Sequence, residues 1–237
     1  MTAERVRVPG FLPSENGFRF ENSFPSEPLF ELSLGFARVP IGDARNGVCG
    51  GMVMAARDLF ESNLLPPPDR VPPKPGSALY RYLVRRLFDS FDLPGGPFRY
   101  LGWMWLPAGD TRSGLKGLAR RTIEEHWPRI RADLDSGVLC PLGLVRARTN
   151  PFELGRNHQA LAYGYDLDVD RARLGIHVYD PNHPGEDDVA LSLSVADPAS
   201  RTPVGYVEGE LPVFAFFRTR YRRGNQRALA SFGVPMA

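Results

Sequence analysis

The hydrophobic pattern of the chain changes character at Ser136–Gly137. Before this point, apolar residues recur every three to four positions in segments 50–60 and 77–91, which predicts amphipathic helices. A third helical region, 113–137, contains Pro128, which favours a break or a new helix start close to it. After this point, short apolar runs alternate with turn sequences, which predicts strands.

The order of these elements predicts the fold class. Helices come first and an antiparallel sheet second, which is typical of an α+β fold. A chain of 237 residues is long enough for one large domain, so we predict a single domain over 1–237. Residues 1–17 are expected to form an extended N-terminal arm and residues 223–237 a C-terminal tail. The expected strands are 138–147, 158–168, 173–181, 189–196 and 211–221, with a hairpin turn at 168–172.

Two segments are not expected to be helical. Residues 1 to about 45 are rich in Pro, Gly and Phe and are expected to hold short extended segments. The proline-dense segment 65–75 can be neither a helix nor a central strand, so we expect an ordered surface loop. Helix-like sequence resumes directly after it, and Ser77 is the expected N-cap of that helix. Whether this insert acts as a lid stays open.

Composition and charge narrow the class of protein. Hydrophobic residues make up 43% and charged residues 24%, as in ordinary globular proteins. The net charge of +2 gives no overall preference for nucleic acid or membrane, and we expect neither as a partner. No apolar run has the length of a membrane span, and the N-terminus has no apolar signal segment, so a cytoplasmic location is the default expectation, with export by another route as the alternative. The basic segment 218–227 is expected to be a solvated edge, with phosphate or acidic-surface binding as the alternative.

The chain has two cysteines, which cannot form a disulfide framework or a zinc site. Cys49 stands between Val48 and the pair Gly50–Gly51, where a helix is expected to begin. A helix N-terminus supplies partial positive charge and free N–H groups, which favour a thiolate. The glycines leave room for a substrate carbonyl, and the Cys49 N–H can bind an oxyanion. A buried, inert cysteine fits the local pattern equally well.

A histidine and an aspartate in the strand region complete a chemical hypothesis. His158 opens one expected strand and Asp180 ends the next one. Neighbouring antiparallel strands can bring the two side chains together, so that Asp180 accepts a hydrogen bond from one ring nitrogen and the other nitrogen faces Cys49. Asn182 is an alternative orienting residue. The sequence Asp-Pro-Asn also forms turns by itself, without any catalytic role.

The stretches "NGVCGGM", "NHQALAYGYD" and "HVYDPNHPG", in this order, resemble the papain-like cysteine peptidase fold. Within it they are similar to the bacteriocin-processing, double-glycine-cleaving peptidases and to uncharacterised bacterial proteins sharing "CGGM". The resemblance covers roughly residues 18–221 and implies a cysteine-bearing helix packed on an antiparallel sheet. It implies Cys49 as nucleophile, His158 as base and Asp180 as orienting acid. The supporting or oxyanion residues are expected to be Asn46, Gly50 and Asn182.

The chain departs from the papain pattern in two places. Asp43 occupies the position, six residues before the cysteine, where papain-like enzymes place a glutamine; Asn46 offers an amide three residues before it. The insert from 65 to about 110 has no counterpart. The leading hypothesis is a hydrolase that cleaves a peptide or isopeptide bond of a peptide or protein substrate through an acyl-enzyme. The alternatives are an inactive papain-fold binding protein and a transglutaminase-like acyl transferase.

No cofactor or metal is expected. Asp180, Asn182 and Gly185 match three positions of a calcium loop, but the bidentate glutamate is missing. The other histidines are assigned no role: we expect His126 and His183 to face solvent, and His177 to face solvent or a shallow groove. The tryptophans Trp103 and Trp105 are expected in the core or a pocket wall.

Overall fold

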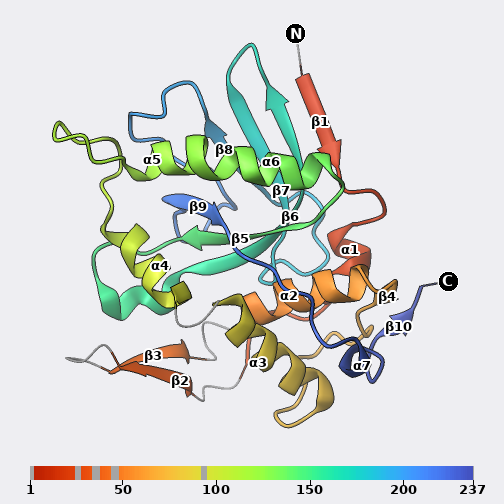
Figure 1. The fold of residues 1–237 in the computed structure, drawn as a ribbon. Helices are drawn as coiled ribbons and strands as arrows, with labels where there is room; N and C mark the ends of the chain where they lie inside the picture. Colours follow the sequence, from red (N-terminus) through yellow and green to blue (C-terminus); the bar gives the residue numbers. More distant parts are fainter. Residues whose placement is uncertain (1–2, 25–27, 34–37, 44–47, 92–94, 237) are drawn as a thin grey trace.

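A six-stranded antiparallel sheet forms the centre of the protein (Figure 1). The computed structural model describes residues 3–24, 28–33, 38–43, 48–91 and 95–236. Five strands follow the order β8-β7-β6-β5-β9, and β1 pairs with β6 beside them. The strands are β1 (Ala3–Arg7), β5 (Cys140–Val145), β6 (His158–Asp168), β7 (Arg173–Tyr179), β8 (Ala190–Ser194) and β9 (Ala215–Arg218). With the helices described below, this arrangement confirms the α+β fold class.

A run of helical segments between residues 49 and 135 precedes β5 in the chain (Figure 1). They are α2 (Cys49–Phe60), α3 (Ala78–Ser90), α4 (Gly95–Trp105), α5 (Leu118–Arg120), the π-helical segment η2 (Arg121–His126) and α6 (Trp127–Asp135). Helix α2 packs on α3 and contacts β6, whereas α6 contacts β1, β5, β6 and β9. Ser77 caps α3 by accepting a hydrogen bond from Tyr80 N at 3.2 Å, and Pro128 lies in the first turn of α6, as predicted. Among the described residues, none of the helices has the length and apolarity needed to cross a membrane.

Shorter elements complete the fold. These are α1 (Pro13–Asn16), β2 (Pro28–Ser33), β3 (Arg38–Asp43), β4 (Leu64–Leu65), the 3-10 helix η3 (Pro151–Arg156), α7 (Gln226–Leu229) and β10 (Val234–Pro235). The pair β2–β3 forms its own two-stranded sheet, and β3 contacts η3. The expectation of short extended segments before residue 45 is therefore confirmed.

Two adjacent glycines set how closely α2 packs on its neighbours. A Cβ atom on Gly51 would collide with the backbone carbonyl of Leu83 in α3. A Cβ atom on Gly50 would collide with Ser90 Oγ and lie 2.7 Å from Gln159 Nε2. The start of α2 is therefore held against both α3 and β6 at a distance that only glycine permits.

The N-terminal segment is part of the sheet, so the prediction of an extended arm over residues 1–17 is wrong in one respect. β5 pairs with β6 from His158 to Ala162, and β1 pairs with the continuation of the same edge, from Gly164 to Asp168. The segment is extended as predicted, but it fills the edge of β6 that β5 leaves open. Burial of Val8 and Phe11 directly after β1 fixes it there.

The C-terminal segment 223–237 is likewise not a free tail within its described part. Leu229 of α7 is fully buried, and β10 pairs with β4 at the start of the proline-rich insert. The basic segment before it is held by side chains: Arg218 donates to Asp133 Oδ2 at 2.5 Å, and Tyr221 donates to Asp58 Oδ1 at 2.7 Å. Hydrophobic contact and buried polar groups, which the sequence does not display locally, hold this segment in place.

The prediction that His126 and His183 face solvent is wrong. His126 is half-buried between Trp103 and Phe217, accepts a hydrogen bond from Arg218 N at 3.1 Å, and has a pKa lowered to about 4 because burial disfavours its charged form. His183 is also largely covered and lies 3.5 Å from Glu210 Oε1.

The predictions for the histidine of β7 and for the two tryptophans are confirmed only in part. His177 is partly exposed and hydrogen-bonded to Asp166 Oδ2 at 2.9 Å. Trp103 is buried as predicted, but Trp105 is largely exposed. Both tryptophans belong to α4, which was not predicted as a helix.

Candidate active site

Cys49 is the first residue of α2. The N-cap residue, Val48, has no polar side chain to bind the N–H groups of the first turn, so they are not capped from that position. Cys49 is a free thiol with 7% of its surface exposed. The sulfur therefore lies at the positive end of the helix dipole, next to backbone donors.

His158 and Asp180 form a buried pair. His158 begins β6, and Asp180 follows directly after β7. Antiparallel pairing of these strands places the two side chains together, and Nε2 of His158 lies 2.7 Å from Oδ1 of Asp180. Asp180 Oδ1 also accepts the backbone N–H of Asn182 at 2.8 Å. Their exposed fractions are 4% and 1%, so the pair is shielded from water.

The pKa of His158 depends on both Cys49 and Asp180. Burial by itself lowers the pKa of the imidazole, but the charge of Asp180, the charge of Cys49 and hydrogen bonds to both side chains raise it to about 10. The pKa of Asp180 is lowered, because attraction and hydrogen bonding to His158 outweigh the opposing effect of burial. Since Nε2 is taken by Asp180, Nδ1 is the nitrogen left for Cys49.

Replacing the carboxylate should lower the pKa of His158. We expect Asp180→Asn, which keeps the shape but removes the charge, to move the titration midpoint of the His158 ring down by more than about one unit. The measurement is an NMR titration of the imidazole. Asp166→Asn is the matched control, because Asp166 pairs with His177 at 2.9 Å in a second His–Asp pair. A midpoint of His158 that is equal in both variants would argue against the pairing.

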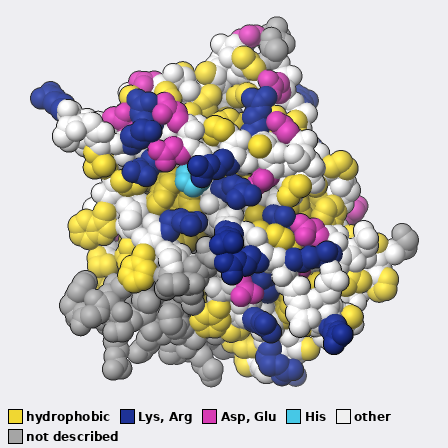
Figure 2. Space-filling view, in the orientation of Figure 1, with side chains coloured by type: hydrophobic (Ala, Val, Ile, Leu, Met, Phe, Trp, Pro, Cys, Tyr) yellow, Lys and Arg dark blue, Asp and Glu magenta, His cyan; other side chains and the backbone are white. Residues whose placement is uncertain are grey.

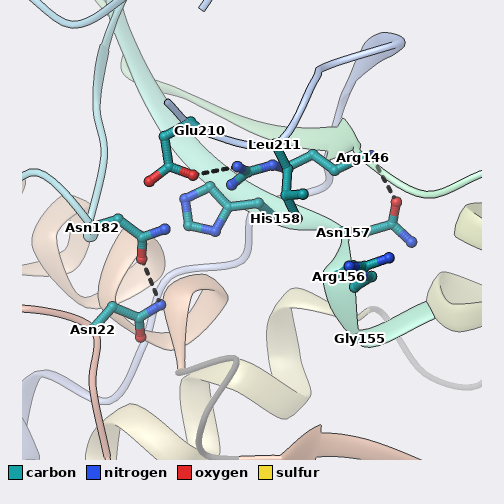
Figure 3. A pocket seen from close by; sticks show the side chains of 9 residues that line it. All are labelled: Asn22, Arg146, Gly155, Arg156, Asn157, His158, Asn182, Glu210 and Leu211. Carbon is teal, nitrogen blue, oxygen red and sulfur yellow. Dashed lines mark hydrogen bonds and ion pairs between the residues drawn. The ribbon is translucent and has the colours of Figure 1, made fainter. Parts of the chain in front are cut away.

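A polar pocket of about 200 Å³ lies beside His158 (Figure 3). Its described lining is Asn22, Arg146, Gly155, Arg156, Asn157, His158, Asn182, Glu210 and Leu211. Arg146 and Glu210 form an ion pair on one side, and Asn22 Nδ2 donates to Asn182 Oδ1 at 3.1 Å on the other. The imidazole lies between these two pairs (Figure 3).

Three residues that the sequence analysis did not single out hold this arrangement. Tyr100 of α4 donates a hydrogen bond to the carbonyl oxygen of His158 at 3.2 Å. Gln159 donates through Nε2 to Ser90 Oγ at 3.0 Å, and both lie against Gly50. The pKa of Tyr100 is raised well above its ordinary value by burial and then by the charge of Cys49. These buried polar groups tie β6 to α3 and α4 around the cysteine.

Three of the predicted site residues meet at His158, whose imidazole is hydrogen-bonded to Asp180 and interacts with Cys49. Gly50 packs beneath Ser90 and Gln159 as described above. Asn182 supports Asp180 through its backbone N–H rather than replacing it, because its side-chain oxygen bonds to Asn22.

Three further positions considered in the sequence analysis are Asn46, Asp43 and Cys140. Asn46 lies outside the described residues, and Asp43 is the last residue of β3. Cys140 is fully buried in β5, and burial raises the pKa of its thiol well above the ordinary range. The two cysteines are unpaired, so Cys140 offers an internal reference for the reactivity of Cys49.

Comparison with protein-family models, with curated proteins and with solved structures gives no match to this chain. The assignment of a function therefore depends on the geometry and chemistry of the site.

Proposed function

We propose that the protein is a cysteine peptidase-like hydrolase of the papain-like type, with Cys49, His158 and Asp180 as its triad. The observation that supports this most is a single buried imidazole that bonds Asp180 through Nε2 and interacts with a cysteine at a helix start. A nucleophile, a base and a group orienting that base are the parts that acyl-transfer chemistry needs.

In the proposed reaction, Cys49 and His158 form a thiolate–imidazolium pair in which the thiol proton resides on Nδ1 of His158, in keeping with the raised pKa of the ring. The thiolate sulfur attacks a carbonyl carbon of the substrate. The oxyanion that forms is stabilised by backbone N–H groups at the start of α2. The imidazolium then gives its proton to the departing amine, which leaves an acyl-enzyme thioester on Cys49. Water, deprotonated by His158, attacks the thioester and releases the acid. Asp180 keeps the ring oriented and stabilises its charged form throughout.

A peptide library incubated with the protein and analysed by mass spectrometry tests this proposal. We expect cleavage by the wild-type protein, none by Cys49→Ala, and a transient mass increase on the Cys49 peptide after acid quenching. Cys140→Ala is the matched control and should cleave normally, because that thiol is buried and Cys140 pairs with Ala162, at the other end of the β5–β6 ladder from His158. Cleavage that persists in Cys49→Ala would rule out this mechanism.

The burial of the triad favours a second candidate function. Cys49 and His158 are each more than nine-tenths covered, as expected if the fold served binding rather than catalysis. A non-catalytic binding protein would leave Cys49 unmodified by thiol reagents until the chain is unfolded. Selective modification of the folded protein supports the hydrolase instead.

A further inference from the structure

We propose that the pocket beside His158 is a subsite that binds a carboxylate group of the substrate. This inference rests on the proposed function, because it assigns the substrate class of the same site. The carboxylate can belong to a peptide C-terminus or to an acidic side chain, which share the same chemistry.

The charges of the lining favour an anion. Among the described lining residues, two guanidinium groups, Arg146 and Arg156, stand against one carboxylate, Glu210. The imidazole of His158 forms a further wall, and its positive charge is balanced by the bound Asp180. Glu210 is bound to Arg146 and Asp180 to His158, whereas Arg156 is paired only with Glu153 at the surface, which leaves Arg156 as the cation that can turn to a ligand. Arginine is the side chain best suited to bind a carboxylate, through paired N–H donors.

The hydrogen-bonding groups of the lining also favour an anionic ligand. The side-chain oxygen of Asn182 is used by Asn22, and its amide nitrogen is directed toward the imidazole (Figure 3). Asn157 is fully engaged: its oxygen accepts from Arg146 N at 2.9 Å, and its nitrogen donates to Leu154 O at 2.9 Å. Asn22 Oδ1 is an acceptor without a partner among the described residues, whereas the Asn182 amide nitrogen and the exposed Arg156 offer donors, which suit an acceptor such as a carboxylate.

The side chains of Arg146 and Arg156 differ in how firmly their ion pairs hold them. Arg146 has a buried side chain fixed by Glu210, and its Nε has no partner among the described residues. Arg156 is 50% exposed and pairs with Glu153 at 2.9 Å on the surface. Such a surface pair contributes little stability, so Arg156 can exchange Glu153 for a ligand carboxylate. Arg156 is therefore the residue whose loss should affect binding without affecting folding.

Position links this subsite to the reaction. The pocket is lined by the same imidazole that interacts with Cys49. A substrate held by its carboxylate in the pocket would therefore have a neighbouring carbonyl group on the cysteine side of the ring. We infer that the bond attacked lies close to a carboxylate in the substrate.

Protection of Cys49 against iodoacetamide at pH 7 tests the inference. Three small blockers are compared: N-acetyl-Ala-Ala, the same dipeptide as its C-terminal amide, and N-acetyl-Ala-Asp amide. We expect a blocker with a carboxylate to halve the alkylation rate at a concentration about fivefold or more below that of the neutral amide. Protection by the first blocker identifies a C-terminal carboxylate, and protection by the third identifies an acidic side chain.

Two variants make the result specific. Arg156→Gln should bring the carboxylate and amide forms within about twofold of each other. Arg171→Gln is the matched control, since Arg171 is 72% exposed and pairs with Asp168 in the turn after β6, outside the pocket. It should keep the full preference. Thermal unfolding of both variants should match that of the wild type, because neither side chain is buried.

Three results would overturn the subsite: equal protection by the neutral amide, absence of protection by every blocker, or an unchanged preference in Arg156→Gln. Failure of the proposed function looks different. It would appear as alkylation of Cys49 that does not depend on His158, whatever the blocker.

Discussion

His158→Ala is expected to slow the alkylation of Cys49 by iodoacetamide at pH 7 by about 100-fold. The reactive species is the thiolate, and a neighbouring imidazole forms it by accepting the thiol proton. A positioned base contributes about 10²- to 10⁴-fold in reactions of this kind, and the lower end is expected for a reagent that needs no leaving-group protonation. The rate is measured by mass spectrometry of the Cys49 peptide.

The chain contains matched controls for this experiment. Cys140 in the same sample should stay unlabelled until the protein unfolds, because it is fully buried and its thiol pKa is raised. His177→Ala removes another histidine hydrogen-bonded to an aspartate and should leave the Cys49 rate unchanged. Equal Cys49 rates in wild type and His158→Ala would mean that the imidazole does not act on the sulfur.

Arg86→Met is expected to lower the free energy of unfolding by about 3–5 kcal/mol. Asp58 in α2 is fully buried, and its carboxylate accepts hydrogen bonds from Arg86 Nε at 2.7 Å and Tyr82 Oη at 2.8 Å. The other oxygen accepts from Tyr221 Oη at 2.7 Å and Gly224 N at 2.9 Å. Removing Arg86 leaves this buried negative charge without its cation, which costs far more than a surface pair.

Chemical denaturation measures this loss, and Arg131→Met is the control. Arg131 pairs with Glu4 at 2.6 Å, but both side chains are more than a third exposed, so the expected cost is below about 1 kcal/mol. The buried group joins α2, α3 and the C-terminal segment, and so it also holds the helix that begins with Cys49. A loss for Arg86→Met no greater than for Arg131→Met would show that the buried group does not stabilise this junction.

The parts of the fold that sequence patterns predicted are those with strong local signals. Local signals depend on residues that are neighbours in sequence. They are the apolar spacing of α2 and α3, the Ser77 cap, and the apolar runs that alternate with turn sequences after residue 137. Helix α4 was missed because Gly95-Gly96-Pro97 is typical of a turn, and its stability comes from packing of Tyr100, Trp103 and Met104.

Among the site residues too, those with a local sequence signal were predicted and those without one were missed. His158 and Asp180 were predicted as a pair because strand ends in a hairpin can be placed from the turn between them. Tyr100 and Glu210 were not, because each reaches the site from a segment far away in sequence, and Arg146, directly after β5, was not, because its place in the site depends on the distant Glu210. Long-range contacts of this kind leave no periodic or spacing signal in a single sequence.

The most direct test of the central claim, that Cys49 and Asp180 act on one imidazole, is the NMR titration of His158 in Cys49→Ala. The wild-type ring should titrate well above its ordinary pKa of about 6.5. Removing the sulfur takes away a charge and a hydrogen bond that favour the protonated ring, so the midpoint should fall while the bond to Asp180 remains. A His158 midpoint that is identical with and without the Cys49 thiol would contradict the triad.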